Sequence, residues 1–333
     1  MLSKKEIICP EQLLKLAKTK GPVKVVIVNA GKAISIESVK QAVDEGLIDP
    51  IFVGDKKVIE QLASDIKWDI SNYEIIDEPI ENNTAPIAAK MASEGKVKII
   101  VKGHIHTDIL MKAVLKRDLN LIGKKRLSHI WHMTLEKNDK PFIITDGALN
   151  VLPKLETKMH ILKNSVDFAK RIGINKPKVS ILSATEEVLE SVPSSIDAKE
   201  LTERAKKEGI DADVFGPMAF DNSVSENAAE ITKIAKDENL NADVFGPLAF
   251  DNSISKKSAA IKGIKNNVAG VADVLLVPSV ETGNGLVKMM IYFMGACAAG
   301  VVVGGKVPVV ITSRSDEAQA RLASIAAAVV ALD

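Results

Sequence analysis

The chain has 333 residues, of which 46% are hydrophobic and 26% charged, and its formal net charge is +1. This length and composition predict a globular protein of about two domains. Lys and Arg are spread along the chain with acids between them, which excludes sequence-independent binding of nucleic acid, because contact with a phosphate backbone needs a clustered basic surface.

Short apolar runs rich in Val and Ile recur along the chain, with helix-period segments between them. Continuous rather than alternating apolar strands are typical of parallel sheets covered on both faces, so the predicted fold class is α/β with right-handed crossovers. The expected strands are 23–28, 51–53, 97–101, 142–145, 179–182, 274–277 and 307–311. The helices that capping and first-turn residues mark are 35–45, 109–116 and 316–331.

A basic, glycine-containing segment at 123–128 separates a first αβ series from a second. The last strand and helix, 307–332, lie at the chain end and are expected to return to the first sheet. The expected domains are therefore 1–126 plus 307–333, and 127–306.

Eleven residues of the second domain occur twice, as DVFGPMAFDNS at 213–223 and DVFGPLAFDNS at 243–253. The similarity extends outward to a unit of helix, strand, turn and the start of a helix, at 202–229 and 232–259. Two copies are too few for a stacked repeat architecture. We interpret them as a local duplication, with one copy in the working position and one spare.

The two cysteines, Cys9 and Cys297, are too few for a disulfide framework or a cysteine zinc site, which favours the reduced cytoplasm. The start of the chain lacks the apolar core of a secretory signal. The longest uncharged stretch, 289–305, is interrupted by glycines, so we expect a buried helix followed by a buried strand instead of a membrane span.

Four strand ends are followed by polar or glycine-containing segments. Ligands of open parallel sheets bind beyond the carboxyl ends of strands, where helix N-termini present unpaired N–H groups to anions. The candidate residues are Lys102, Gly103 and Thr107; Gly246, Pro247, Asp251 and Asn252 in the second repeated block; Glu281, Gly283 and Asn284; and Ser313, Arg314 and Asp316.

Each segment also has a purely structural interpretation. Lys102 can mark an ordinary strand exit, and Glu281 and Asn284 can cap the following helix. Arg314 can form a salt bridge with Asp316 or Glu317. His104-x-His106 lacks a third ligand nearby, so no metal site is predicted.

No motif for covalent catalysis presents itself. The chain has no G-x-S-x-G elbow, no P-loop and no G-x-G-x-x-G after the first strand. Cys9 lies in the N-terminal segment and Cys297 in an apolar stretch expected to be helical, where a thiol behaves as a small hydrophobe. Direct transfer between two bound substrates is therefore favoured.

Three long motifs resemble the phosphate acyltransferases, and the butyryl branch more than the acetyl branch. They are GPLAFDNSISKKSAAIKGI at 246–264, ADVLLVPSVETGN at 272–284 and KVPVVITSRSD at 306–316, supported by VKG at 101–103, LSH at 127–129 and DGALNVLPKLETK at 146–158. The resemblance covers nearly the whole chain. It implies two three-layer α/β/α domains with mainly parallel sheets, an architecture related to the isocitrate and isopropylmalate dehydrogenases, a cleft between the domains, and a homodimer.

The reaction that the resemblance implies is reversible acyl transfer between coenzyme A and inorganic phosphate. Acyl-CoA and phosphate are then substrates, with no tightly bound cofactor and no nucleic-acid or membrane partner. By the family's Ser-Arg motif, Arg314 pairs with an anionic substrate group and Ser313 donates a hydrogen bond to the transition state. Fixed donors and a guanidinium stabilise the oxyanion of a tetrahedral species.

Two departures from the family pattern bear on activity. The position of the acetyl branch's base is occupied by Ala320, so Asp316 is the replacement candidate. Phe215 and Phe245 stand where the family commonly has Asp before Gly-Pro. The alternatives are therefore a phosphate acetyltransferase or a low-activity acyl-CoA-binding member. A metal- and nicotinamide-dependent decarboxylating dehydrogenase would share only the architecture and lacks its paired-Asp motif.

Only the second repeated block continues into the family pattern through 281–284. We therefore expect 243–253 in the cleft, and the first copy, 213–223, as an extra strand and turn at a sheet edge.

Overall fold

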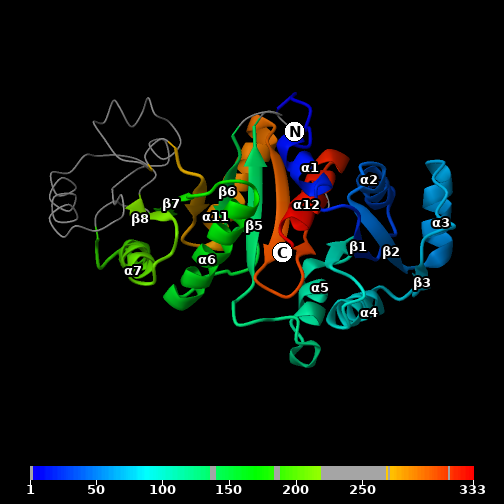
Figure 1. The fold of residues 1–333 in the computed structure, drawn as a ribbon, viewed down its shortest axis with the longest axis horizontal. Helices are drawn as coiled ribbons and strands as arrows, with labels where there is room; N and C mark the ends of the chain where they lie inside the picture. The colour runs from blue at the N-terminus through cyan, green and yellow to red at the C-terminus, as the bar shows by residue number, and fades with distance from the viewer. Residues whose placement is uncertain (1–2, 136–139, 184–187, 219–267, 269–270, 314–315) are drawn as a thin grey trace. The chain divides into compact units, whose positions relative to one another are not determined.

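The computed structural model describes residues 3–135, 140–183, 188–218, 268, 271–313 and 316–333 (Figure 1). The chain divides into two compact units. Unit 1 is Met1–Lys140 with Lys288–Asp333, and unit 2 is Pro141–Val287. The boundaries expected from composition, at 126/127 and 306/307, stay a prediction.

The described residues of unit 1 form seven strands in the order β3-β2-β1-β4-β11-β10-β5. All neighbours from β3 to β11 pair in parallel, whereas β10 is antiparallel to both β11 and β5. The strands are β1 (Val23–Val28), β2 (Ile48–Gly54), β3 (Ile75–Asp77), β4 (Ile99–Lys102), β5 (Ser128–Thr134), β10 (Cys297–Val303) and β11 (Val309–Val310).

The pairing of β11 with β4 brings the chain end back to the first sheet, as the sequence predicted. Its register aligns Val309 with Ile100 and Val310 with Val101. This return places three loops side by side, because β1, β4 and β11 are consecutive parallel strands whose carboxyl ends share one edge.

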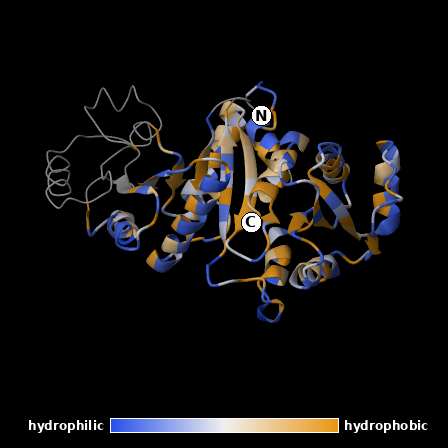
Figure 2. Ribbon diagram, in the orientation of Figure 1, coloured by the Kyte–Doolittle hydropathy of each residue, from blue (hydrophilic) through white to orange (hydrophobic). Residues whose placement is uncertain are grey.

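The helices of unit 1 form two groups by their mutual contacts. In one, α12 packs on α1 and α2; in the other, α4 packs on α5. Figure 2 shows the hydrophobic colour concentrated on the strands and on the helix faces against them, as burial of apolar surface requires. The helices are α1 (Glu11–Lys18), α2 (Ala33–Asp44), α3 (Lys56–Asp65), α4 (Glu81–Ser93), α5 (Thr107–Val114) and α12 (Ala318–Val330), with a 3₁₀ turn at η1 (Arg117–Leu119).

Helix α12 is buried on every side from Ala320 to Val330. Its Ala-rich sequence allows this, because small side chains let the helix pack between α1, α2 and the strands β10 and β11. A helix that is apolar all round belongs in a core. Its start at Ala318 is two residues later than predicted.

Unit 2 contains four parallel strands in the order β6-β9-β7-β8 among the residues described. They are β6 (Phe142–Thr145), β7 (Lys178–Leu182), β8 (Asp213–Met218) and β9 (Val274–Leu276), with helices α6 (Leu155–Arg171) and α7 (Pro193–Lys207) packed on them and on each other. Strand β8 is the beginning of the first repeated block and is the last strand in this order, whereas the turn expected in that block lies outside the described residues. The second block lies outside the described residues.

Helix α11 (Val280–Met294) and β10 correct two predictions for the uncharged stretch 289–305. The strand is buried as expected, but the helix exposes Met289 by 43% and Phe293 by 64%. Cys297 is the first residue of β10 and is not helical, because Gly295 ends the helix with a φ of 67°.

Candidate functional site

The candidate site of unit 1 lies where β1, β4 and β11 end. Segments 29–32, 103–106 and 311–317 leave these strands and lead into α2, α5 and α12. Carboxyl ends of neighbouring parallel strands are the common place for a ligand in an α/β sheet.

The exits of β1 and β4 are fastened to each other by hydrogen bonds. Asn29 Nδ2 donates to the carbonyl oxygen of His104 at 2.7 Å, and the His104 N–H donates to the Asn29 carbonyl oxygen at 2.7 Å. Asn29 has a left-handed φ of 54°, which Asn tolerates better than most residues. The sequence alone gives no role to Asn29.

Gly103 is required by a close backbone approach. A Cβ at this position would lie 2.5 Å from the carbonyl oxygens of both Val28 and Asn29. We expect Gly103→Ala to lower the free energy of unfolding by about 1–3 kcal/mol, because these backbone atoms cannot move aside freely. Gly123→Ala is the control, since its Cβ would have its nearest neighbour 4.0 Å away. Urea denaturation of both variants checks this, and equal losses would rule out the close approach.

The loop after β11 is closed by Asp316. Its Oδ2 accepts a hydrogen bond from the Ser313 N–H at 2.6 Å, and the Asp316 N–H donates to the Ser313 carbonyl oxygen at 3.3 Å. The N-cap of α12 is Glu317, which makes no side-chain capping bond. Asp316 therefore closes a turn on Ser313. Arg314 lies outside the described residues.

The environment of Asp316 favours its protonated form. Burial raises the pKa of this carboxyl above its usual range, while the hydrogen bond from Ser313 and the charges of Arg321, Lys102 and Lys288 oppose the rise. A carboxylate whose pKa is raised is a better proton acceptor once ionised.

Two buried cations flank the same loop. Lys102, 5% exposed, donates from Nζ to the Thr312 carbonyl oxygen at 3.2 Å. Arg321, also 5% exposed, donates to Thr312, Ser313 and Asp316. Arg321 was not among the predicted site residues, although it is a lone charge within the apolar segment 318–330.

Unit 2 has an ordered loop after β6. Asp146, 2% exposed, accepts from the N–H groups of Ala148 and Leu149 at 3.0 and 2.9 Å, and from Asn150 Nδ2 at 2.6 Å. The carboxylate thus holds the loop in one shape through charge-assisted hydrogen bonds.

The first turn of α11 packs against this loop. A Cβ at Gly283 would lie 2.7 Å from the Cα of Gly147, so only glycine fits there. Glu281 and Asn284 lie inside the helix and are exposed, so their interpretation as helix caps is wrong.

The predicted site residues lie in unit 1, in unit 2 or outside the described part of the chain. In unit 1 it brings Lys102, Ser313 and Asp316 to one loop, with Gly103 and half-buried Thr107 at the exit of the adjacent strand. The residues of unit 2 are Glu281, Gly283 and Asn284. The predicted residues outside the described part are Arg314, Gly246, Pro247, Asp251 and Asn252.

Both cysteines are buried. Burial raises the pKa of Cys297 to about 12 and raises the pKa of Cys9 as well. Neither thiol is therefore ionised near neutral pH, which agrees with their predicted role as small hydrophobes.

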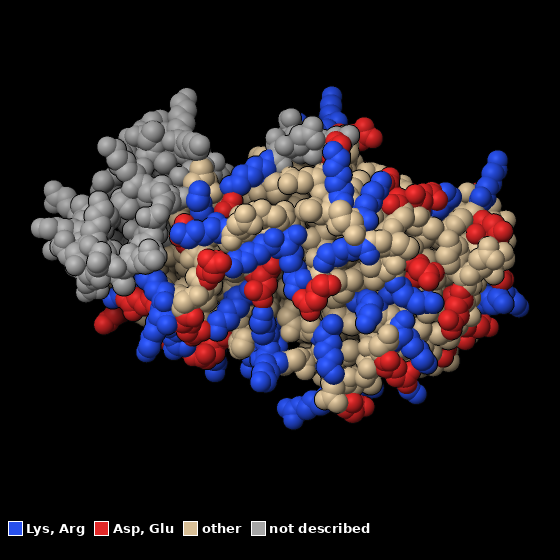
Figure 3. Space-filling view, in the orientation of Figure 1, with Lys and Arg blue, Asp and Glu red and all other residues tan. Residues whose placement is uncertain are grey.

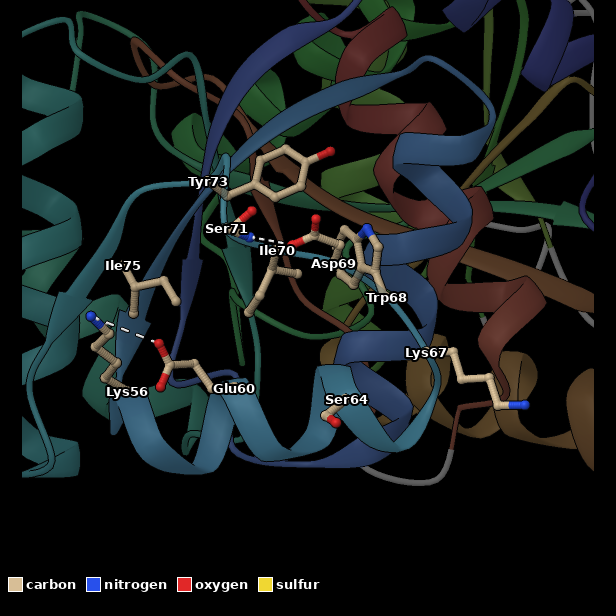
Figure 4. A pocket seen from close by; sticks show the side chains of 10 residues that line it. All are labelled: Lys56, Glu60, Ser64, Lys67, Trp68, Asp69, Ile70, Ser71, Tyr73 and Ile75. Atoms are coloured by element: carbon tan, nitrogen blue, oxygen red, sulfur yellow. Dashed lines mark hydrogen bonds and ion pairs between the residues drawn. The ribbon is translucent and has the colours of Figure 1, made fainter.

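A hollow of about 690 Å³ lies between α3 and the segment before β3 (Figure 4). Its Lys56 faces Glu60 at 3.7 Å, and Asp69 accepts from the Ser71 N–H at 2.9 Å. The rings of Trp68 and Tyr73 contact each other in a tilted arrangement, with ring centroids 5.6 Å apart. None of the predicted site residues lines it, so we do not place the reaction there.

Charges on the face drawn in Figure 3 alternate in sign, with Lys and Arg beside Asp and Glu. Among the described residues, no three His, Cys, Asp or Glu side chains gather to hold a metal ion.

Comparison with known proteins gives consistent results. A family model described as phosphate acetyl/butaryl transferase matches residues 74–230 and 222–329. Phosphate acetyltransferase of Rhizobium meliloti is 34% identical over 319 residues, covering 96% of this chain and 92% of the relative. Phosphate butyryltransferase of Clostridium acetobutylicum is 33% identical over 320 residues, covering 95% and 96%. The crystal structure of a branched-chain phosphotransacylase from Enterococcus faecalis V583 superposes with a TM-score of 0.71 at 28% identity, covering 93% of this chain and 98% of that chain.

The two family matches divide at the duplication. The match over 74–230 contains the first repeated block and the match over 222–329 contains the second. Each copy therefore aligns with the family, which agrees with a local duplication.

Proposed function

The chain belongs to the phosphate acetyl/butyryltransferase family and is a phosphate acyltransferase, and we propose that it transfers butyryl or a similar short acyl group at the loop Ser313–Asp316. The observation that carries this placement is Asp316, a carboxyl with a raised pKa that closes the loop beside two buried cations.

In the proposed reaction a phosphate oxygen attacks the thioester carbonyl of acyl-CoA. A C–O bond forms, the tetrahedral oxyanion collapses, the C–S bond breaks, and CoA leaves as a thiolate. In reverse, Asp316 accepts the thiol proton and the sulfur attacks the carbonyl carbon of the acyl phosphate. A C–S bond forms, the C–O bond to phosphate breaks, and phosphate leaves. Ser313 and Arg314 stabilise the oxyanion and the phosphate charge.

Substrate binding involves two further sets of residues. We assign phosphate and CoA contacts to Lys102, Gly103 and Thr107, and to Glu281, Gly283 and Asn284. Holding both substrates in line supplies much of the rate enhancement without a covalent intermediate.

Sequence identity does not distinguish an acetyl from a butyryl substrate. The acetyltransferase of Rhizobium meliloti is 34% identical to this chain and the butyryltransferase of Clostridium acetobutylicum is 33% identical. The test is the initial rate of phosphate-dependent CoA release from acetyl-, propionyl-, butyryl- and isobutyryl-CoA. We expect the highest kcat/KM with a four-carbon acyl group. A highest value with acetyl-CoA would establish the acetyltransferase alternative, and binding without turnover would establish the low-activity alternative.

We also propose a cytoplasmic homodimer with CoA as a substrate and no tightly bound cofactor. Its support is an exposed apolar stripe on α11, formed by Met289, Tyr292 and Phe293, since large apolar side chains grouped at a surface commonly meet a partner. No helix within the described ranges is long and apolar enough to cross a membrane.

The duplicated block makes a paired prediction possible. We expect Asp251→Ala and Asn252→Ala to lower the rate of acyl transfer, and Asp221→Ala and Asn222→Ala to leave it unchanged, because only the second copy continues into the family pattern. Four single variants assayed side by side measure this. Equal losses from both copies would mean that either copy can occupy the working position.

A further inference from the structure

Arg321 is the one charged residue of α12 and is 5% exposed. A buried guanidinium is strongly unfavourable unless its donors are matched by acceptors. Its neighbours in the helix are Ala320 and Leu322, which offer no side-chain acceptor. The acceptors must therefore come from elsewhere in unit 1.

Within the described part of the chain, the hydrogen bonds of this guanidinium go to the loop that follows β11. Nη1 donates to Thr312 Oγ1 at 3.0 Å, Nη2 to the Ser313 carbonyl oxygen at 2.8 Å, and Nε to the Asp316 carbonyl oxygen at 3.1 Å. Because the guanidinium is planar and rigid, it holds three residues in a fixed geometry that the rotatable donors of an ammonium group do not reproduce.

Lys102 holds the same loop from β4, through the bond from Nζ to the Thr312 carbonyl oxygen. Thr312, 3% exposed, is thus bound by two cations, one at its carbonyl oxygen and one at its hydroxyl. The loop is fixed at its start and at its end before any substrate arrives, as preorganised catalysis requires.

We infer that Arg321 is a positioning residue of the acyl-transfer reaction, which holds Ser313 and Asp316 in the geometry that receives the substrates. This inference rests on the proposed function. Arg321 acts through the loop, and its replacement should therefore affect kcat more than KM.

The charges around Asp316 provide a readout that loss of packing alone does not move. Lys102 from β4, Lys288 from α11 and Arg321 from α12 all lower the pKa of Asp316, and Cys297 on β10 is neutral near neutral pH. Removing the charge of Arg321 should therefore shift the acid limb of the pH–rate profile to higher pH.

The test compares Arg321→Gln and Arg321→Lys with Ser324→Ala. Ser324 is buried on the same helix, where it donates to the Ala320 carbonyl oxygen at 2.8 Å and accepts from the Gly300 N–H at 3.0 Å. These two bonds join α12 to itself and to β10. We expect Arg321→Gln to lower kcat for thiol attack by about 100-fold, as a small misplacement of catalytic groups can. Arg321→Lys should keep the acid limb near its wild-type position and recover only part of kcat.

Ser324→Ala should lower the melting temperature, with kcat and the pH profile unchanged. A kcat of Arg321→Gln equal to that of Ser324→Ala would overturn the inference.

Thr312→Val, which removes the acceptor of Nη1, completes a double-mutant cycle with Arg321→Lys. We expect the double variant to lose no more than the larger single loss, and additive losses would contradict coupling through Thr312.

Hydrogen exchange of the peptide 312–317 gives a readout that is independent of turnover. The Ser313 N–H is protected by its bond to Asp316, so it should exchange faster in Arg321→Gln and at the wild-type rate in Ser324→Ala. If the wild type is active and the Arg321→Gln variant has the same exchange rate and the same kcat as the wild type, this inference alone is overturned. A wild type without phosphate-dependent CoA release overturns the proposed function.

Discussion

Arg314→Ala is expected to lower kcat/KM for acyl transfer by roughly 100- to 1,000-fold, the effect of removing one main stabiliser of transition-state charge. In the proposed reaction this guanidinium pairs with an anionic substrate group in two parallel hydrogen bonds. The melting temperature should change little, because the preceding residue, Ser313, is exposed beyond the end of β11. Steady-state kinetics and thermal unfolding measure the two effects separately.

Arg314→Lys should recover little of this loss, since an ammonium cannot reproduce the two-pronged geometry. Arg117→Ala is the matched control, because Arg117 is an exposed arginine of unit 1 in the 3₁₀ turn η1. Near wild-type kcat/KM in the Lys variant would remove Arg314 from the catalytic residues.

Asp316→Asn is expected to slow the thiol-attack direction by about 100- to 10,000-fold, the usual contribution of a general base. Asparagine retains an oxygen that can accept from the Ser313 N–H, so the turn is preserved while proton acceptance is lost. The measurement is the rate of acyl-CoA formation from acyl phosphate and CoA as a function of pH.

The sign of the pH dependence follows from the raised pKa of Asp316. In the wild type, thiol attack should rise with pH through this pKa, above the usual Asp value of about 3.9, because only the ionised carboxyl accepts a proton. In the Asp316→Asn variant, this rise in the rate of thiol attack with pH should be absent.

The free energy of unfolding of the wild type should fall over the pH range in which the rate of thiol attack rises. A carboxyl whose folded-state pKa is raised favours the folded state below its unfolded pKa, and this contribution is lost as pH rises through the folded pKa. The asparagine of the Asp316→Asn variant cannot ionise, so this variant should not lose stability as the pH rises. Its melting temperature near neutral pH should therefore be no lower than that of the wild type.

Glu317→Gln is the control for both measurements, because Glu317 is the adjacent, exposed carboxylate and makes no side-chain capping bond. It should keep the wild-type rate and pH profile. An Asp316→Asn variant that loses melting temperature but keeps its rate would assign Asp316 a purely structural role.

Much of the fold could be predicted because the parallel strands are continuous Val and Ile runs. Strand β1 has its predicted bounds, 23–28, and β6 has 142–145. The expected return of the last strand to the first sheet is confirmed by the pairing of β11 with β4.

Strand β5 was missed because its sequence, SHIWHMT, mixes polar and apolar residues although all seven are buried. Such a pattern matches neither a continuous apolar run nor the alternation of a half-exposed strand. Its antiparallel partner β10 was anticipated as a strand, but no local signal gives the direction of pairing.

The sequence points to candidate residues only near strand ends, as at Lys102, the last residue of β4, and at Ser313, shortly after β11. Arg321 was missed because its importance comes from three acceptors in a loop five to nine residues earlier, and that contact depends on how α12 packs. The role of Asn29 likewise depends on a partner, His104, that is distant in sequence.

The most direct measurement follows butyryl-CoA, free thiol and acyl phosphate together, with and without inorganic phosphate. Phosphorus NMR detects the acyl phosphate, and a thiol reagent detects CoA. We predict thiol release only with phosphate present, with one acyl phosphate formed for each CoA. Thiol release without phosphate, or without acyl phosphate, would indicate hydrolysis and would contradict acyl transfer between coenzyme A and phosphate.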